Sequence, residues 1–410
     1  MAELLFLAHR IPYPPDRGDK IRSFHELRHL AGLGRVHLAC FADDEGDAAH
    51  LAGLREALGG ALGEAHVEVR RTSRAAAGAR ALIAGKPVSL TLFESPALRR
   101  FVERLLAERD IATLFAFSGQ MAQFVPQGAR ARFVMDFGDV DSAKFEAYAE
   151  AGGAMALVHR REAARLAAFE RETAARADVS LFVSAAEAEL FRRRSGLGDA
   201  DIRALQNGVD LDFYDPEAQA FGLGPSFPAK AGEEKSSLIV FTGQMDYAPN
   251  IDAVRWFADA VMPLLPEARF AIVGRKPTEA VRRLAGPRTI VTGAVPDVRS
   301  WLAAADVVAA PLRIARGIQN KVLEAMAMAR PVVASPAAYE GIEAEPGRDL
   351  LVADGAEAQA DAISGLLADP ERAGAMGRAA RLRMERAYRW EARLAPLGEM
   401  AGLTPRRAAA

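Results

Sequence analysis

Short apolar runs alternate with longer amphipathic stretches along most of this chain. Such runs, when rich in Val, Ile, Leu and Phe, are typical of strands buried on both faces of a sheet. In the first half they occupy residues 4–8, 36–41, 66–69, 113–117, 133–137, 179–183 and 202–205. The stretches between them, for example 21–33 and 155–177, are long enough for helices. Regular alternation of strands and helices predicts an α/β fold with parallel sheets.

A stretch rich in Pro, Gly, Ala and Lys, residues 215–236, breaks this alternation without any periodicity, so we interpret it as a linker. Beyond it, apolar runs resume at residues 238–242, 269–273, 289–291, 307–312, 331–335 and 350–352. The second half therefore repeats the organisation of the first. We predict two Rossmann-like domains, residues 1–214 and residues 237–387, followed by an amphipathic helix in residues 388–410.

Composition narrows the class of protein. The chain has 410 residues, enough for about two or three domains. Its formal net charge of −2 gives no overall basic field, so we expect no nucleic-acid partner. Cys40 is the only cysteine, which excludes an internal disulfide framework. We find no export signal and no apolar stretch of the roughly 18 residues that span a membrane, so we expect a cytoplasmic protein, attached at most to a membrane surface.

Residues 311–335 carry the strongest functional signal. They read as the end of a strand, a loop closed by Gly317, a helix over 318–328 and a further strand. The apolar residues of this helix lie on one face, which we expect to pack on the sheet. Lys321 and Glu324 share the other face because they are three residues apart.

A lysine in the first turn of a helix lies near the positive end of the helix dipole, where a cation is disfavoured. A bound anion reverses this penalty, because helix-start amides and a lysine both attract negative charge. We therefore interpret Lys321 as part of a phosphate site, with Glu324 one turn deeper as an acceptor for the hydroxyls of a ribose. The alternative is a solvated helix with a weak surface ion pair.

Further candidates follow other strands of the second half. Gly243 and Gly274 each come directly after a strand-like run. A glycine in this position lets the backbone approach a ligand closely. Arg275 and Lys276 follow Gly274, and two cations at the carboxyl end of a strand suit a diphosphate.

In the first half, a loop with three prolines follows the first strand-like run, without the G-x-G-x-x-G fingerprint of dinucleotide-binding proteins. Asp136, Asp139 and Asp141 cluster at the end of a later strand, where open α/β sheets bind ligands. Their spacing matches no metal site, so we expect no metal. The alternative for this cluster is helix capping by Asp141 or Ser142.

The residues G-I-Q-N-K-V-L-E-A-M-A, followed by a Pro-Val-Val strand, resemble the donor-site segment of family 4 retaining glycosyltransferases. The family pattern has two glutamates separated by seven residues. Glu324 matches the second, and Arg316 occupies the position of the first. With G-Q-M-D-Y-A-P-N upstream, the segment is similar to the sugar transferases associated with PEP-CTERM/exosortase systems of Gram-negative bacteria.

The resemblance implies a GT-B fold, in which two Rossmann-like domains face each other across a cleft and the C-terminal helix crosses back to the first domain. It implies a hexosyltransferase that needs no metal or cofactor and retains the anomeric configuration. The donor is then a nucleotide diphosphate sugar. The acceptor is a saccharide, by analogy a lipid-linked one in exopolysaccharide biosynthesis, with peripheral contact to the inner membrane.

The resemblance also assigns residues to roles. We assign catalytic roles to Lys321, Arg316 and Arg275. The donor-binding candidates are Gly243, Gly274, Lys276, Gly293, Val295, Gly317, Asn320 and Glu324. The acceptor-side candidates are Arg17, Gly18, Asp19, Lys20, Asp139 and Ser118, the last in a region where family members often have a histidine. Asp297, near Val295, matches the same loop, and its alternative role is to cap the helix that follows.

Other interpretations stay open. A nucleotide-sugar 2-epimerase on the same fold would need further catalytic acids and a histidine near the sugar. A two-lobed solute-binding protein would usually carry an export signal. A catalytically silent homologue is consistent with Arg316 in place of glutamate. The basic and apolar residues 75–110 could lie on an anionic membrane, although we favour a helical pair that covers the sheet.

Overall fold

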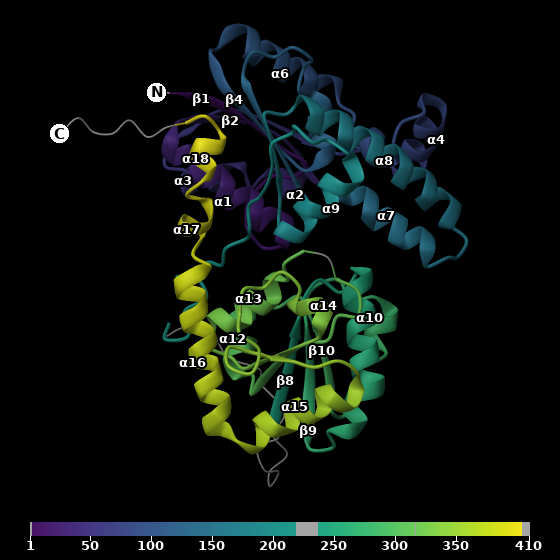
Figure 1. The fold of residues 1–410 in the computed structure, drawn as a ribbon, viewed down its shortest axis with the longest axis vertical. Coiled ribbons are helices and arrows are strands. Elements are labelled where there is room, and N and C mark those ends of the chain that lie inside the picture. Colours follow the sequence, from purple (N-terminus) through teal and green to yellow (C-terminus); the bar gives the residue numbers. More distant parts are fainter. Residues whose placement is uncertain (1, 219–236, 316, 404–410) are drawn as a thin grey trace, which may run out of the picture. The chain divides into compact units, whose positions relative to one another are not determined.

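The computed structural model describes residues 2–218, 237–315 and 317–403 (Figure 1). The chain divides into two compact units, Met1–Gln206 with Leu394–Ala410, and Asn207–Arg393. Most of the expected linker, residues 219–236, lies outside the described residues, and so does Arg316.

The first unit is built on one parallel sheet with the strand order β3-β2-β1-β4-β5-β6-β7. Its strands are β1 (Glu3–Ala8), β2 (Arg35–Ala42), β3 (Leu62–Val69), β4 (Ile111–Phe117), β5 (Arg132–Gly138), β6 (Val179–Phe182) and β7 (Ile202–Ala204). Its helices are α1 (Gly18–Leu33), α2 (Glu45–Ala48), α3 (Leu51–Ala57), α4 (Arg74–Ala84), α5 (Val88–Leu92), α6 (Pro96–Glu108), α7 (Asp141–Glu150), α8 (Ala156–Arg176), α9 (Ala185–Ser195) and α18 (Leu397–Met400).

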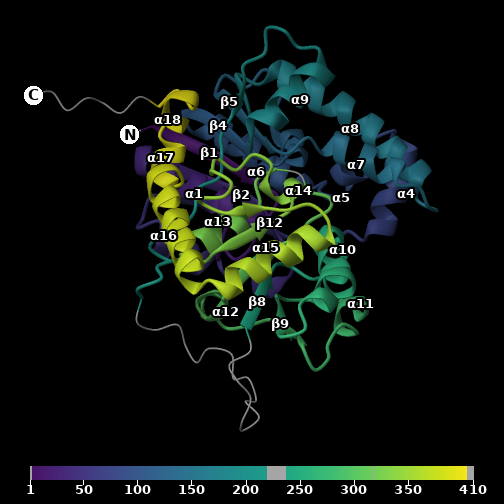
Figure 2. The ribbon, with the colours of Figure 1, turned by 60° about the horizontal axis from the view of Figure 1, so that its bottom comes forward.

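The second unit has its own parallel sheet, in the order β10-β9-β8-β11-β12-β13. Its strands are β8 (Ser237–Thr242), β9 (Ala268–Val273), β10 (Thr289–Gly293), β11 (Val307–Ala310), β12 (Val332–Ala334) and β13 (Leu351–Val352). Its helices are α10 (Ala248–Trp256), α11 (Glu279–Arg282), α12 (Val298–Ala304), α13 (Asn320–Ala327), α14 (Pro336–Tyr339), α15 (Ala356–Ala368) and α16 (Pro370–Ala387). In Figures 1 and 2, α10 and α16 lie on opposite sides of these strands.

Both sheets have the same topology. In each, the first strand of the unit lies between its second and fourth strands, so the chain order reverses between β1 and β4 and between β8 and β11. At such a switch point the following loops leave in opposite directions and open a crevice at the carboxyl edge of the sheet. The predicted α/β fold with two Rossmann-like halves is confirmed.

The boundaries of the two units differ from the predicted domain boundaries. Val209 and Leu211 are buried in the apolar core of the second unit. The amide of Val209 donates to the carbonyl oxygen of Tyr388 at 2.7 Å. Residues 207–214 and 388–393 therefore pack with the second unit, because this core buries their apolar side chains.

The C-terminal segment forms two short helices, α17 (Trp390–Leu394) and α18, instead of the one predicted helix. Residues 390–393 of α17 belong to the second unit, and α18 belongs to the first. Pro396 separates them, and proline lacks the amide hydrogen that a continuous helix needs. The carbonyl oxygens of Met400 and Ala401 accept hydrogen bonds from Arg132 and Thr113, at 2.7 and 2.8 Å. These contacts attach the segment to β5 and β4.

Candidate functional site

The carboxyl edge of the second sheet holds the strongest candidate site. Gly243 follows β8 directly, and the loop after β11 leads into α13, so both flank the switch point of this unit. The N-cap residue of α13, Gln319, makes no side-chain cap hydrogen bond. The start of this helix therefore lies, without a cap from that residue, at the place where doubly wound sheets bind a ligand.

Two glycines allow a close approach of backbones at this edge. A β-carbon on Gly274 would lie 1.6 Å from the carbonyl oxygen of Gly243. A β-carbon on Gly243 would lie 2.8 Å from Nδ2 of Asn250 and 3.2 Å from Nζ of Lys321. The loops after β8 and β9 are therefore in direct backbone contact, and Lys321 reaches the first of them.

The ammonium group of Lys321 is held by two contacts that are not carboxylates. Its Nζ donates to Oδ1 of Asn250 at 2.5 Å and lies 4.3 Å from the centre of the Phe241 ring. Asn250 is buried and donates through Nδ2 to the carbonyl oxygen of Gln244 at 2.9 Å, which fixes its orientation. An amide oxygen and an aromatic face position this cation without neutralising it, so its attraction for an anion is kept.

Glu324 lies one turn deeper in α13 and shares a hydrogen bond with the side chain of Tyr214. Tyr214 belongs to the segment that opens the second unit. At the beginning of that segment, Nδ2 of Asn207 donates to Oδ1 of Asn320 at 3.1 Å. The segment 207–214 therefore lies against α13 and supplies polar contacts to its exposed face.

Burial brings the two charged groups of α13 to similar pKa values. It lowers the pKa of Lys321 to about 7, against the opposing charge of Glu324. It raises the pKa of Glu324 to about 7, against the hydrogen bond from Tyr214 and the charge of Lys321. Both groups therefore titrate near neutrality and respond strongly to a charged ligand.

The other donor-side candidates lie after strands of the same sheet. Gly317 and Gly293 have φ angles of +65° and +70°, a left-handed backbone that favours glycine. Val295 packs against the apolar core. Lys276 is exposed and also left-handed, with φ of +55°, a strained conformation that is common in ligand loops. The backbone of Arg275 is fixed through its carbonyl oxygen, which accepts from the amide of Met245 at 2.9 Å.

Among the donor-side residues, the structure thus gathers Gly243, Gly274, Asn320, Lys321 and Glu324. Arg316 lies outside the described residues. The side chain of Asp297 accepts from the amide of Arg299, which confirms its predicted role as the N-cap of α12.

The first unit has a charged cluster at its own switch point. His9 follows β1, and its Nε2 lies 3.1 Å from Oδ2 of Asp19 and 3.0 Å from Nη1 of Arg10. Asp19 also accepts from Arg10 at 2.6 Å and pairs with Arg17 at 3.0 Å. Gly18 begins α1, which has no side-chain cap. Three of the acceptor-side candidates, Arg17, Gly18 and Asp19, therefore lie beside His9.

Asp43, just after β2, extends this cluster. It accepts from Arg10, Arg17 and Arg70 at 3.1, 3.2 and 2.8 Å. Burial opposes ionisation of both carboxyls. The guanidinium groups of Arg70, Arg10 and Arg17 hold the pKa of Asp43 well below its usual range. The hydrogen bond to His9, together with Arg10 and Arg17, does the same for the pKa of Asp19. Within this cluster, three guanidinium groups face two carboxylates, so its own formal charge is positive.

Lys20 is positioned differently from its neighbours. It is 5% exposed, and its Nζ donates to Oδ1 of Asp47 at 2.5 Å and to the carbonyl oxygen of Tyr13 at 3.3 Å. These contacts use the ammonium group inside the unit, so Lys20 stabilises the loop and offers little to a ligand.

His9 was not among the residues selected from the sequence. Its ring packs against those of Phe93 and Phe117, with centres 6.0 and 5.7 Å apart. It is 8% exposed, and within the described part of the chain its Nδ1 has no hydrogen-bond partner. Burial lowers the pKa of His9, which favours the neutral ring. The signal that could have found it is its place, directly after the first strand.

Ser118 lies across the switch point from His9, directly after β4. Its φ of +76° is strained for a residue with a β-carbon, and its amide donates to the carbonyl oxygen of Asp136 at 2.7 Å. Strain of this kind costs about 1–3 kcal/mol and is concentrated at functional sites. The geometry keeps Ser118 as a candidate on the acceptor side.

Of the acidic residues after β5, Asp136 has a structural role and Asp139 remains a candidate acceptor-side residue. Asp136 is fully buried and pairs with Arg22 at 2.7 Å, so it belongs to the core. Burial raises the pKa of Asp139 to about 7, and the charges of Glu187 and Asp141 add to this shift. Asp139 is therefore half-protonated near neutrality, as acid–base candidates often are.

The predicted helix cap in this cluster is wrong. α7 begins at Asp141, its N-cap residue is Val140, and no side chain of the segment caps it. Instead, Glu187 accepts from the amide of Val140 at 2.8 Å and Glu170 accepts from that of Ser142 at 2.9 Å. Carboxylates from α8 and α9 thus satisfy the amides that a local cap would use.

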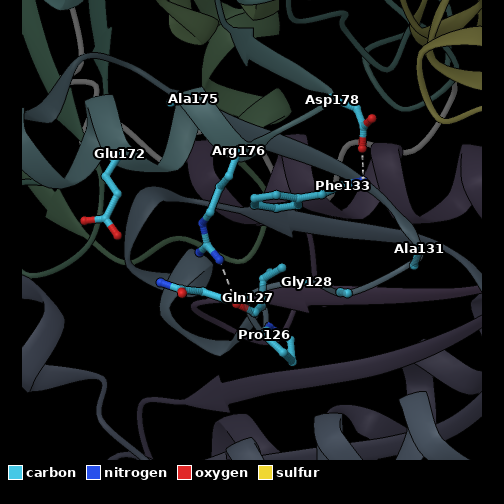
Figure 3. Close-up of a pocket in the computed structure, with 11 residues that line it drawn as sticks. Pro126, Gln127, Gly128, Ala131, Phe133, Glu172, Ala175, Arg176 and Asp178 are labelled. Carbon is cyan, nitrogen blue, oxygen red and sulfur yellow. Dashed lines mark hydrogen bonds between the residues drawn. The ribbon is translucent and has the colours of Figure 1, made fainter.

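A surface pocket elsewhere in the first unit does not belong to the candidate site (Figure 3). It is lined by residues 125–129 and by Phe133, Arg176 and Asp178. Arg176 donates to the carbonyl oxygen of Val125 at 2.9 Å, and Asp178 accepts from the amide of Phe133 at 2.7 Å. The pocket lies where β5 and β6 begin, at the sheet edge opposite the switch point. Its charged side chains Arg176 and Asp178 hydrogen-bond to backbone groups.

Two further observations concern metals and membranes. Within residues 2–218, 237–315 and 317–403, His, Cys, Asp and Glu side chains form no group of three that could hold a metal ion. No helix of this described part is both long and apolar enough to cross a bilayer.

Comparison with known proteins agrees with this geometry. Residues 236–369 match the model of the family described as glycosyl transferases group 1. A GDP-mannose-dependent alpha-(1-6)-phosphatidylinositol monomannoside mannosyltransferase of Mycolicibacterium smegmatis is 28% identical over 342 residues, which cover 77% of this chain and 82% of that protein.

Solved structures match along nearly the whole chain. Sucrose-phosphate synthase from Thermosynechococcus elongatus superposes with a TM-score of 0.69 and 18% identity, over 98% of both chains. HepE from Anabaena, solved with UDP and glucose, superposes with a TM-score of 0.66 and 16% identity, over 98% of this chain and 100% of that one. The fold is that of the GT-B glycosyltransferases. The family match itself covers residues 236–369.

Proposed function

We propose that this chain is a retaining, metal-independent hexosyltransferase that moves a sugar from a nucleotide diphosphate sugar to a saccharide acceptor. The observation that carries the proposal is Lys321 at the uncapped start of α13, held by Asn250 and Phe241 beside the Gly243 backbone. A cation, the amides of a helix start and a glycine that permits close approach are together what a diphosphate needs.

On the donor side, Lys321 and the first amides of α13 face the diphosphate, and Glu324 accepts hydrogen bonds from the ribose. Asn250 acts as a positioning residue, since it directs the ammonium group toward Gly243. Arg275 and Lys276 add positive charge after β9. The backbone near Gly293 and Val295 holds the base. HepE, solved with UDP and glucose, supports a nucleotide donor of this kind.

The chemistry that these residues promote is loss of the nucleoside diphosphate. As the bond between the anomeric carbon and the phosphate oxygen breaks, negative charge develops on the diphosphate, and Lys321 with the helix-start amides stabilises it. The acceptor oxygen bonds to the anomeric carbon on the same face, and its proton passes to the departing phosphate oxygen. This route retains configuration and requires neither a metal ion nor a strong protein base.

On the acceptor side, the cluster around His9, Arg17 and Asp19, together with Ser118 and Asp139, lines the switch point of the first unit. The acceptor is a lipid-linked saccharide in exopolysaccharide biosynthesis, at the cytoplasmic face of the inner membrane. Two observations support this part: the resemblance to PEP-CTERM/exosortase-associated transferases, and the phosphatidylinositol monomannoside named for the mannosyltransferase relative. The net positive charge of the cluster suits an acceptor that carries phosphate.

A turnover assay tests the proposal. The purified chain is incubated with labelled UDP-, GDP- and ADP-sugars and lipid-linked saccharides, with and without a chelator. We expect transfer from one of these donors at an unchanged rate in the chelator, and a product whose anomeric configuration, measured by NMR, equals that of the donor. Inverted product contradicts retention, and loss of rate in the chelator contradicts metal independence. Epimerised donor without transfer identifies an epimerase instead.

Donor binding is expected to be strongest near pH 7 and to weaken about tenfold per pH unit well away from it on either side. Above pH 7 the empty site loses the charge of Lys321, and below pH 7 Glu324 becomes protonated. Calorimetric titration with an intact nucleotide sugar measures this, because its diphosphate does not titrate in the range. The Glu324→Gln variant should lose the acid side of the profile. Its alkaline side should move to lower pH, because the charge of Glu324 raises the pKa of Lys321. A flat profile for the unaltered protein contradicts the assignment.

A further inference from the structure

Half of the large apolar side chains that the structure exposes lie in one region of the first unit. Among the described residues, ten large apolar side chains are exposed. Five of them belong to the end of α4 or to the beginning of α8: Leu82 (67%), Ile83 (89%), Met155 (53%), Leu157 (76%) and Val158 (45%). We call these five residues the α4–α8 surface. Gathered apolar exposure of this kind marks an interaction site, whereas scattered single residues do not.

Hydrogen bonds place the two halves of this surface together. Nη2 of Arg161, in the second turn of α8, donates to the carbonyl oxygens of Ala81 at 2.8 Å and Lys86 at 3.2 Å. Glu162 accepts from the amides of Val88 and Ser89 at 2.7 and 2.9 Å. The last turn of α4 is therefore attached to the first turns of α8, and both views show these helices side by side (Figures 1 and 2).

The sheet does not use these apolar side chains. In the same stretch of sequence, α6 buries Leu98, Val102 and Leu105 against the strands. α4 buries only alanines, Ala77 and Ala81. The helical cover expected for residues 75–110 is thus supplied by α6, while the largest side chains of α4 point into solvent.

The charge around the α4–α8 surface is mainly positive. Residues 75–86 contain Arg80 and Lys86, and residues 151–161 contain Arg160 and Arg161. Arg80 and Lys86 share Glu94 as a partner, and Arg160 is exposed. Apolar side chains rimmed by long cations are the composition of segments that lie in the interface of an anionic bilayer.

We propose that the α4–α8 surface binds the headgroup region of an anionic phospholipid bilayer. Leu82, Ile83 and Leu157 enter the interface, and Arg80, Lys86 and Arg160 contact the lipid phosphates. A second copy of this chain fits the surface less well, because two copies would bring the same positive charges together. This surface would bring the chain to the membrane that holds the proposed lipid-linked acceptor. Its binding to lipid does not depend on which nucleotide sugar the chain uses.

Co-sedimentation of the full chain with vesicles tests the proposal. Vesicles of phosphatidylcholine mixed with phosphatidylglycerol are compared with phosphatidylcholine alone, at low and high salt. We expect binding to the anionic vesicles that weakens with salt. The double variant Ile83→Asn, Leu157→Asn should lower the partition coefficient about tenfold or more, because it removes two large apolar side chains from the interface. Leu264→Asn, at a leucine of the second unit that is 48% exposed, should bind like the unaltered protein.

Charge reversal gives an independent pair of variants. Arg160→Glu should weaken binding to anionic vesicles about tenfold, and Arg386→Glu, an exposed arginine of α16, should not. Equal binding to both kinds of vesicle, or full binding by the double variant, overturns the proposal. A change in oligomeric state without a change in vesicle binding also overturns it, in favour of self-association. Nucleotide-sugar affinity should be the same in all these variants, which separates failure of this inference from failure of the proposed function.

Discussion

Replacing Lys321 with methionine is expected to lower kcat/KM for sugar transfer by about 10²–10³-fold, the effect of removing one preorganised group that stabilises developing charge. The fold should be unaffected. Burial already disfavours the charged ammonium, as its pKa of about 7 shows, and methionine can occupy the space beside the Phe241 ring. We therefore expect the melting temperature of the variant to equal or exceed that of the unaltered protein.

The matched control for this variant is Arg386→Met. It removes one cation from an exposed position on α16 of the same unit, so it changes net charge equally without touching α13. Steady-state kinetics of both variants with the donor found in the turnover assay give the comparison. Equal loss of kcat/KM in both would show that overall charge, and not the position of Lys321, governs transfer.

Replacing Gly274 with alanine is expected to cost about 3 kcal/mol or more in the free energy of unfolding and to abolish donor binding. The new β-carbon would lie 1.6 Å from the carbonyl oxygen of Gly243, and backbone cannot yield as a flexible side chain can. The loops after β8 and β9 would have to separate. That movement takes Gly243 away from Lys321, so the proposed diphosphate site is lost.

Gly286→Ala is the control for Gly274→Ala. The nearest atom to a β-carbon at Gly286 is the carbonyl oxygen of Leu284 at 4.0 Å, so the substitution fits without movement. Chemical denaturation of both variants measures the difference in unfolding free energy. If the Gly274 variant is as stable as the Gly286 variant and binds the donor normally, the close contact of the two loops is not required.

The fold could be predicted from local pattern because each strand is a short apolar run between amphipathic helices. The same applies to α13, whose apolar face with Val322, Ala325 and Met326 is buried as predicted. A helix boundary that depends on a single residue was harder to predict. Pro396 divides the expected C-terminal helix, although the apolar pattern continues across it.

The candidate site could be predicted only in part, because its contacts join residues far apart in sequence. Lys321 was identifiable from its place at a helix start. Asn250, its hydrogen-bond partner, is 71 residues away, and no local signal connects the two. The start of α7 was hard to predict for the same reason. Glu170 accepts from an amide 28 residues before it, and Glu187 accepts from an amide 47 residues before it.

The central claim is that the ammonium group of Lys321 binds the diphosphate of the donor. Isothermal titration of the unaltered protein and of Lys321→Met with the same nucleotide sugar at pH 7 tests it most directly. A melting curve first shows that the variant is folded. We predict that it binds the nucleotide sugar at least about 100-fold more weakly than the unaltered protein does. Equal affinity in the two proteins would contradict the account.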